Sequence, residues 1–201
     1  MPLTLASTSP SRLQLLRMAG IDPIVIAPEV DEEAVAEAAG ELSPGDYVQL
    51  LATSKARAVA AKEGIGTTLV LGCDSAFEFD GDVYGKPGTP DVALERWLHM
   101  RGRAGVLHTG HCLIDPATGM QATRVVSTEV EFAEVTEAEV QWYVSTGEPL
   151  NVAGAFTLEG LAAPFITRVV GDPHAVVGLS LATLRELAIE LGSRWSALIA
   201  K

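Results

Sequence analysis

Short apolar runs alternate with amphipathic stretches along the chain of 201 residues. The compact apolar runs at 3–6 and 67–72 predict buried strands. Ser9-Pro10 and Ser43-Pro44 each combine a helix N-cap with proline at the first helical position. We therefore expect one helix directly after the first strand and a long helix, centred on 47–62, directly before the second.

Later in the chain the pattern changes to paired strands. Asp80-Gly81-Asp82 separates two short apolar segments, which is a hairpin signal. A second hairpin is expected between 106–114 and 122–132, and alternation of apolar and polar residues in its second arm is typical of a half-buried strand. Further helices should follow Thr89-Pro90 and the capping box that begins at Thr136. Because strands and helices interleave without a linker, we predict one α/β (mixed α+β) domain over 1–201 with a mixed sheet.

Composition excludes several classes of protein. The chain has 14 Lys+Arg against 26 Asp+Glu, a net charge of −12. Binding to a nucleic acid polymer or to an anionic membrane is therefore not expected, because both need clustered positive charge. Cys73 and Cys112 are the only cysteines, too few for a disulfide framework or a four-cysteine zinc site. Without a signal peptide or a membrane-spanning apolar run, the expected location is the cytoplasm.

Two short segments have the chemistry of a phosphate site. Ser7 to Arg12 places hydroxyls and a guanidinium at the start of the first helix, where backbone N–H groups attract anions. The alternative is an ordinary helix cap with a surface arginine. Gly85-Lys86-Pro87 follows the first hairpin and would hold the Lys86 ammonium as a point charge for phosphate. The alternative there is a solvated lysine in a turn.

Two further residues have charged side chains in apolar surroundings. Asp74 follows the apolar run 67–72, and we expect it at the carboxyl end of a buried strand, where open α/β folds place ligands. A carboxylate there can bind a divalent metal or accept a proton from water, although a simple turn aspartate is the alternative. Lys55 lies on the alanine- and leucine-rich long helix, where most lysines would instead be surface residues.

Taken in order, these segments resemble the Maf family of nucleoside triphosphate pyrophosphatases, over almost the whole chain. The segment Met100-Arg101-Gly102-Arg103-Ala104-Gly105 is most similar to actinobacterial members. The resemblance is carried by eight blocks: Leu5–Arg12, Glu29–Glu32, Ser54–Ala56, Gly72–Ser75, Gly85–Pro87, His108–Gly110, Thr146–Phe156 and Val176–Leu179.

The resemblance implies an elongated, two-lobed fold similar to that of inosine triphosphatases, with a central mixed sheet and a cleft between the lobes. It implies hydrolysis of a nucleoside triphosphate to a monophosphate and pyrophosphate, with removal of modified or noncanonical nucleotides and an association with arrest of septum formation. It also implies a divalent cation, Mg²⁺ or Mn²⁺. The alternative is a non-catalytic, nucleotide-responsive regulator of septum formation. A monomer and a homodimer both remain open.

The resemblance also implies roles for single residues. Asp74 matches the proton acceptor, and Glu32 matches the acidic residue that helps Asp74 to hold the metal. The substrate-binding positions are Ser7, Arg12, Lys55 and Lys86. A local group of cations and a metal would be needed to bind a triphosphate, because the chain as a whole is acidic.

Three positions that could set specificity depart from the pattern of relatives. Ser11 stands where some relatives have arginine. The relatives that act on thymidine or uridine triphosphate have threonine at the place of Ser75 and glutamine at the place of Glu159. A carboxylate only accepts hydrogen bonds, and guanine offers two adjacent donors where uracil and thymine offer one. We therefore expect a guanine-type base, with 7-methylguanine among the candidates, and a solvent-facing Glu159 is the alternative.

Overall fold

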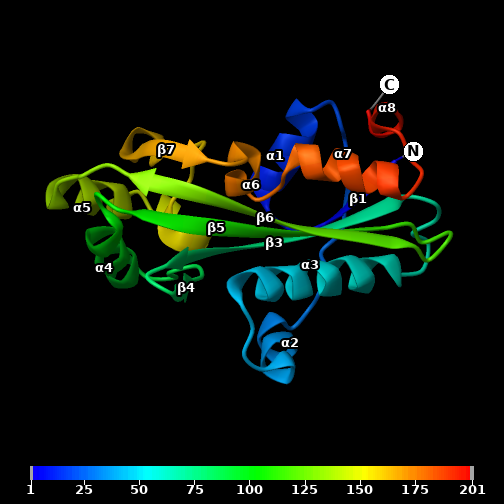
Figure 1. Ribbon diagram of the computed structural model, residues 1–201, viewed down its shortest axis with the longest axis horizontal. Helices are drawn as coiled ribbons and strands as arrows, with labels where there is room; N and C mark the ends of the chain where they lie inside the picture. The colour runs from blue at the N-terminus through cyan, green and yellow to red at the C-terminus, as the bar shows by residue number, and fades with distance from the viewer. Residues whose placement is uncertain (1, 200–201) are drawn as a thin grey trace. The chain divides into compact units, whose positions relative to one another are not determined.

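The computed structural model describes residues 2–199 (Figure 1). It is a mixed α/β fold, as predicted, with a seven-stranded sheet in the order β2-β1-β3-β5-β6-β7 and with β4 paired to β3. The described residues form two compact units: 2–74, 109–126 and 178–199 in unit 1, and 75–108 and 127–177 in unit 2. The elements are β1 (Leu3–Ala6), α1 (Pro10–Met18), β2 (Ile24–Val25), α2 (Glu32–Ala39), α3 (Pro44–Ala60), β3 (Leu69–Phe79), β4 (Asp82–Tyr84), α4 (Pro90–Met100), β5 (Ala104–Ile114), β6 (Gln121–Phe132), α5 (Glu137–Ser145), three 3₁₀ turns (Glu148–Asn151, Ala153–Ala155 and Ala163–Phe165), β7 (Ile166–Val170), α6 (Pro173–Val177), α7 (Leu181–Glu190) and α8 (Trp195–Leu198).

Unit 1 is built on parallel strands. β1 pairs in parallel with both β2 and β3, and its last residue, Ala6, lies beside Gly72. Figure 1 shows α3 on one side of these strands and α1 and α7 on the other. Ala52 and Ala56 of α3 pack on Val70 and Cys112 in a buried cluster. These small residues bring the helix close to the sheet.

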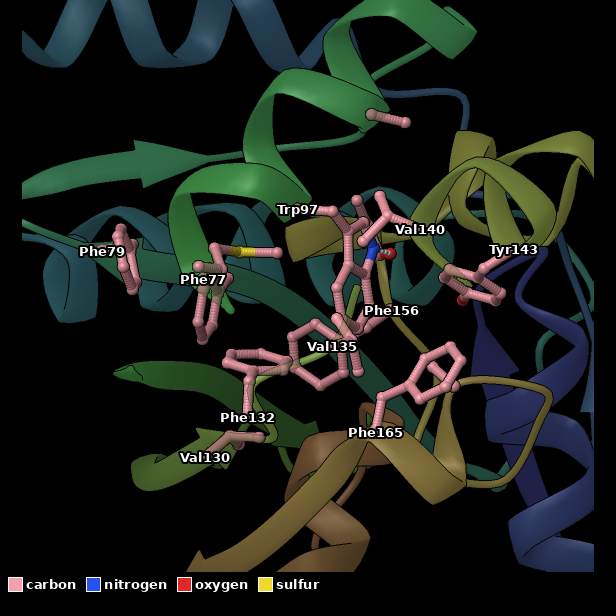
Figure 2. Packing of buried hydrophobic residues seen from close by; sticks show 14 of the residues in the cluster. Phe77, Phe79, Trp97, Val130, Phe132, Val135, Val140, Tyr143, Phe156 and Phe165 are labelled. Atoms are coloured by element: carbon pink, nitrogen blue, oxygen red, sulfur yellow. Dashed lines mark hydrogen bonds between the residues drawn. The ribbon is translucent and has the colours of Figure 1, made fainter. Parts of the chain in front are cut away.

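Unit 2 has an aromatic core. Trp97 of α4 makes edge contacts with Phe132, Tyr143 and Phe165, and its ring N–H donates to the Ala155 carbonyl at 2.7 Å (Figure 2). Packing of large rings in these orientations gains stability beyond the buried area alone. Trp97 therefore lies at the centre of this core and anchors α4 to it.

Turns and caps follow the sequence closely. Ser9, Ser43 and Thr136 cap α1, α3 and α5 as predicted, and Thr136 forms the full capping box with Glu139. In the first hairpin Asp80 and Gly81 have φ values of 54° and 87°. Two successive positive values define the turn that suits the twist of a two-residue hairpin.

The expected position of Asp74 at a strand end is wrong. β3 continues through Asp74 to Phe79, so the residue lies inside an 11-residue strand. Gly72 was the misleading signal, because it serves a close approach of α3 rather than the end of the strand. However, β1 has already ended at the level of Gly72, so Asp74 does extend beyond the carboxyl end of its parallel neighbour.

Candidate active site

Asp74 and Lys55 form a buried ion pair in unit 1. The Lys55 ammonium lies 2.6 Å from Asp74 Oδ1 and 2.9 Å from Glu32 Oε1. The side chains of Lys55 and Asp74 are 8% and 11% exposed, while that of Glu32 is 48% exposed. One ammonium therefore holds two carboxylates, one buried and one at the surface.

Gly72 explains how Lys55 reaches Asp74. A Cβ atom at Gly72 would lie 2.3 Å from the Ala52 carbonyl oxygen and 2.7 Å from the Ala56 nitrogen. Only a residue without a side chain allows α3 to cross β3 at this distance. Lys55, about one turn after Ala52 on α3, is thereby placed beside Asp74, two positions after Gly72 on β3.

Ser7 and Arg12, also in unit 1, are hydrogen-bonded to each other at the start of α1. The Ser7 hydroxyl oxygen accepts from the Ser9 N–H at 3.1 Å and from Arg12 Nη1 at 3.3 Å. Arg12 Nε donates to the Gly178 carbonyl at 2.7 Å, and the arginine is only 9% exposed. This guanidinium is therefore not the surface arginine of an ordinary helix cap. Ser11, on the first turn of α1, is partly exposed.

Burial and the charges of Lys55 and Arg12 both act on the pKa of Asp74. Burial raises the pKa of Asp74 above its ordinary value, while the nearby charges of Lys55 and Arg12 act in the opposite direction. A raised pKa makes the carboxylate a stronger proton acceptor. Burial also raises the pKa of the neighbouring Cys73 thiol to about 12, so this cysteine stays protonated at neutral pH and is a poor nucleophile.

The donor set fits Mg²⁺ or Mn²⁺ bound together with substrate. Glu32 and Asp74 offer oxygen ligands that already converge on one ammonium. Among residues 2–199, no group of three or more histidine, cysteine or acidic residues forms a closed metal cage. Mg²⁺ is commonly held by one or two carboxylates with phosphate oxygens completing its coordination, so two carboxylates are sufficient.

The other predicted residues lie in unit 2. Lys86 is exposed in the loop between β4 and α4. Both sides of that loop are fixed, because the Gly85 carbonyl accepts from Arg96 at 2.6 Å and the Gly88 N–H donates to Leu150 at 3.0 Å. The roles of Lys86, of the partly exposed Ser75 and of the exposed Glu159 stay predictions.

One residue near Glu159 was not predicted to have a role. The Glu148 carboxylate accepts hydrogen bonds from the Tyr143 and Thr157 hydroxyls and from the Leu161 N–H. It thereby fixes the segment that carries Glu159. Its sequence block was part of the family resemblance, but its partners lie up to 13 positions away, so only the fold identifies them.

No helix within residues 2–199 is long and apolar enough to cross a membrane.

Known proteins are similar to this chain over almost its whole length. A nucleoside triphosphate pyrophosphatase of Leifsonia xyli is 53% identical over 98% of this chain and 96% of its own length. One of Streptomyces coelicolor is 50% identical, over 95% of this chain and 91% of its own. Among solved structures, the Ham1 protein of Staphylococcus aureus has a TM-score of 0.44 at 17% identity, covering 81% of this chain and 90% of its own. The family model described as Maf-like protein matches residues 2–191, and the chain belongs to this family.

Proposed function

We propose that this protein is a nucleoside triphosphate pyrophosphatase, which hydrolyses a nucleoside triphosphate to the monophosphate and pyrophosphate. The observation that carries the proposal is the buried pair of Lys55 and Asp74, with Arg12 close enough to act on the pKa of Asp74. Relatives about half identical over nearly the whole chain are named for this activity. A protein that only senses nucleotides has no need of a buried proton acceptor.

Each charged residue has a step in this reaction. Arg12 and Lys55 would bind the phosphates, and the Ser7 hydroxyl keeps the Arg12 guanidinium in place. The phosphate-binding role of Lys86 stays a prediction from the sequence. Asp74 orients the attacking water and takes its proton, and the Lys55 ammonium keeps the carboxylate aimed. Glu32 and Asp74 would hold Mg²⁺ or Mn²⁺, which would supply positive charge against the charge that develops on the departing pyrophosphate.

The base specificity is part of the proposal. The Glu159 carboxylate would accept both hydrogen bonds that the edge of guanine donates, with Ser11 and Ser75 in place of the residues of pyrimidine-specific relatives. Exposure of Glu159 is compatible with a ligand-facing position and with the solvent-facing alternative. The cytoplasmic location and the choice between monomer and homodimer stay predictions.

The first test is pyrophosphate release across normal and modified nucleotides, with Mg²⁺, with Mn²⁺ and with a chelator. We expect turnover that depends on the metal and prefers guanine-type bases. Binding without release of pyrophosphate would support the regulator instead. A clear preference for pyrimidines would contradict the role of Glu159.

The second test is Asp74→Asn, which keeps the shape of the side chain and removes its basicity. We expect kcat to fall roughly 10²- to 10⁴-fold, the usual contribution of a general base, while nucleotide binding is retained. Asp22→Asn is the matched control, because Asp22 is a surface carboxylate of unit 1 paired with Arg17. Unchanged turnover in Asp74→Asn would remove the assignment of Asp74.

A further inference from the structure

His111 on β5 is a fully buried imidazole whose two nitrogens both have partners in unit 1. Its Nε2 accepts a hydrogen bond from the Ser180 N–H at 2.9 Å. Its Nδ1 lies 3.2 Å from the Arg124 carbonyl oxygen. A peptide N–H only donates and a carbonyl only accepts, so these partners require a neutral ring with its proton on Nδ1.

The turn 178–180 contacts both His111 and Arg12. Ser180 begins α7, and its hydroxyl accepts from the Thr183 N–H at 3.0 Å. Two residues earlier, the Gly178 carbonyl accepts from Arg12 Nε at 2.7 Å. Gly178 has a φ of 115°, and a Cβ atom there would lie 3.1 Å from Arg12 Nε. The backbone of this turn is therefore in direct contact with the guanidinium.

We propose that His111 is a positioning residue, whose neutral imidazole fixes the turn 178–180 and through it the direction of the Arg12 guanidinium. An arginine has many rotamers, and the Ser7 hydroxyl holds Arg12 by a hydrogen bond at 3.3 Å. The bond to the Gly178 carbonyl is shorter, but it forms only while the turn keeps its place. His111 is a side chain of the sheet that accepts a hydrogen bond from the backbone of this turn.

The structural part of this proposal is independent of the reaction, whereas its effect on turnover rests on the proposed function. The structural part is tested first in the wild-type protein. We expect ¹⁵N NMR of the ring at neutral pH to show a protonated Nδ1 and an unprotonated Nε2. We also expect slow hydrogen exchange at the Ser180 amide. A ring protonated on Nε2, or on both nitrogens, would overturn the proposal whether or not the protein is an enzyme.

Two substitutions then separate the acceptor from simple bulk. In His111→Gln the side-chain oxygen replaces Nε2 as acceptor for the Ser180 N–H. His111→Asn is too short to do so and leaves that donor without its partner. We expect the Ser180 amide of His111→Asn to exchange faster and the KM for the nucleotide to rise about tenfold, with a smaller change in kcat. His111→Gln should restore most of both.

The control is His174→Asn, at an exposed histidine of α6 in unit 2, which should leave both measurements at wild-type values. If wild type hydrolyses nucleotides but His111→Asn keeps its KM, the link from His111 to Arg12 is wrong. If wild type hydrolyses none of the nucleotides, the proposed function fails, and the exchange of the Ser180 amide still decides the structural part.

Discussion

At the residue scale, the unusual feature is a lysine buried on the apolar side of a helix. The long helix and its lysine follow from the sequence, and the family resemblance implies that Lys55 binds phosphate. The sequence alone does not place the ammonium between Glu32 and Asp74, because those residues lie on three separate elements. Such a contact depends on how α2, α3 and β3 pack, which local spacing does not encode.

We expect Lys55 and Asp74 to be strongly coupled in their contributions to the stability of the fold. Removing Lys55 leaves Asp74 buried without its countercharge, so Lys55→Met should lower the free energy of unfolding by about 3 kcal/mol at neutral pH. In an Asp74→Asn background the same substitution should cost much less, because no buried charge remains. Urea unfolding of the four proteins in this cycle measures the coupling. Additive effects of the two substitutions would show that the ion pair is not an energetic unit.

At the scale of elements, the apolar patterns identified most helices and strands, and capping residues placed four helix starts correctly. The errors concern length and short pieces. β3 is longer than expected, and the 3₁₀ turns at 148–165, α6 and α8 were not predicted. These pieces are held by contacts with distant residues, such as the bond from Trp97 to Ala155, rather than by a local period.

Gly72 allows α3 to pack closely on β3, and this close packing places Lys55 beside Asp74 in the candidate active site. Gly72→Ala would drive a methyl group into the backbone of α3, so we expect a loss of about 1–3 kcal/mol of stability. Because the helix must shift away from β3, the bond from Lys55 to Asp74 should lengthen and kcat/KM should fall. Thermal unfolding and steady-state kinetics measure these effects.

The matched control is Gly45→Ala in the first turn of the same helix. There the new Cβ atom would meet only Val125, at 3.7 Å, and alanine favours helix. This variant should be as stable as wild type or slightly more so. Equal behaviour of the two variants would mean that the close approach at Gly72 has no energetic consequence.

At the scale of the whole molecule, the two units share strands. The chain of β3 passes from unit 1 to unit 2 after Asp74, and β5 and β6 are divided in the same way. Unfolding of one unit must therefore disturb hydrogen-bonded strands of the other. We expect one cooperative transition rather than two.

Side chains of the two units can report this transition separately. Cys73 and Cys112 are buried in unit 1, and burial raises the pKa of these thiols to about 12 and about 11, so at pH 8 both are protonated and unreactive in the folded state. Trp97 is buried in unit 2. In a Trp142→Phe, Trp195→Phe background, thiol labelling and Trp97 fluorescence should change at the same urea concentration. Two distinct midpoints would contradict cooperative unfolding.

The contact between Arg12 and Gly178 has a consequence for protein synthesis. The two residues are separated by 166 positions, so the arginine leaves the ribosome long before its carbonyl partner is made. A nascent chain therefore carries Arg12 without this partner until Gly178 has been added. A product of premature termination that ends between residues 75 and 177 would contain Arg12, Lys55 and Asp74 but would lack the Gly178 carbonyl that accepts from the guanidinium.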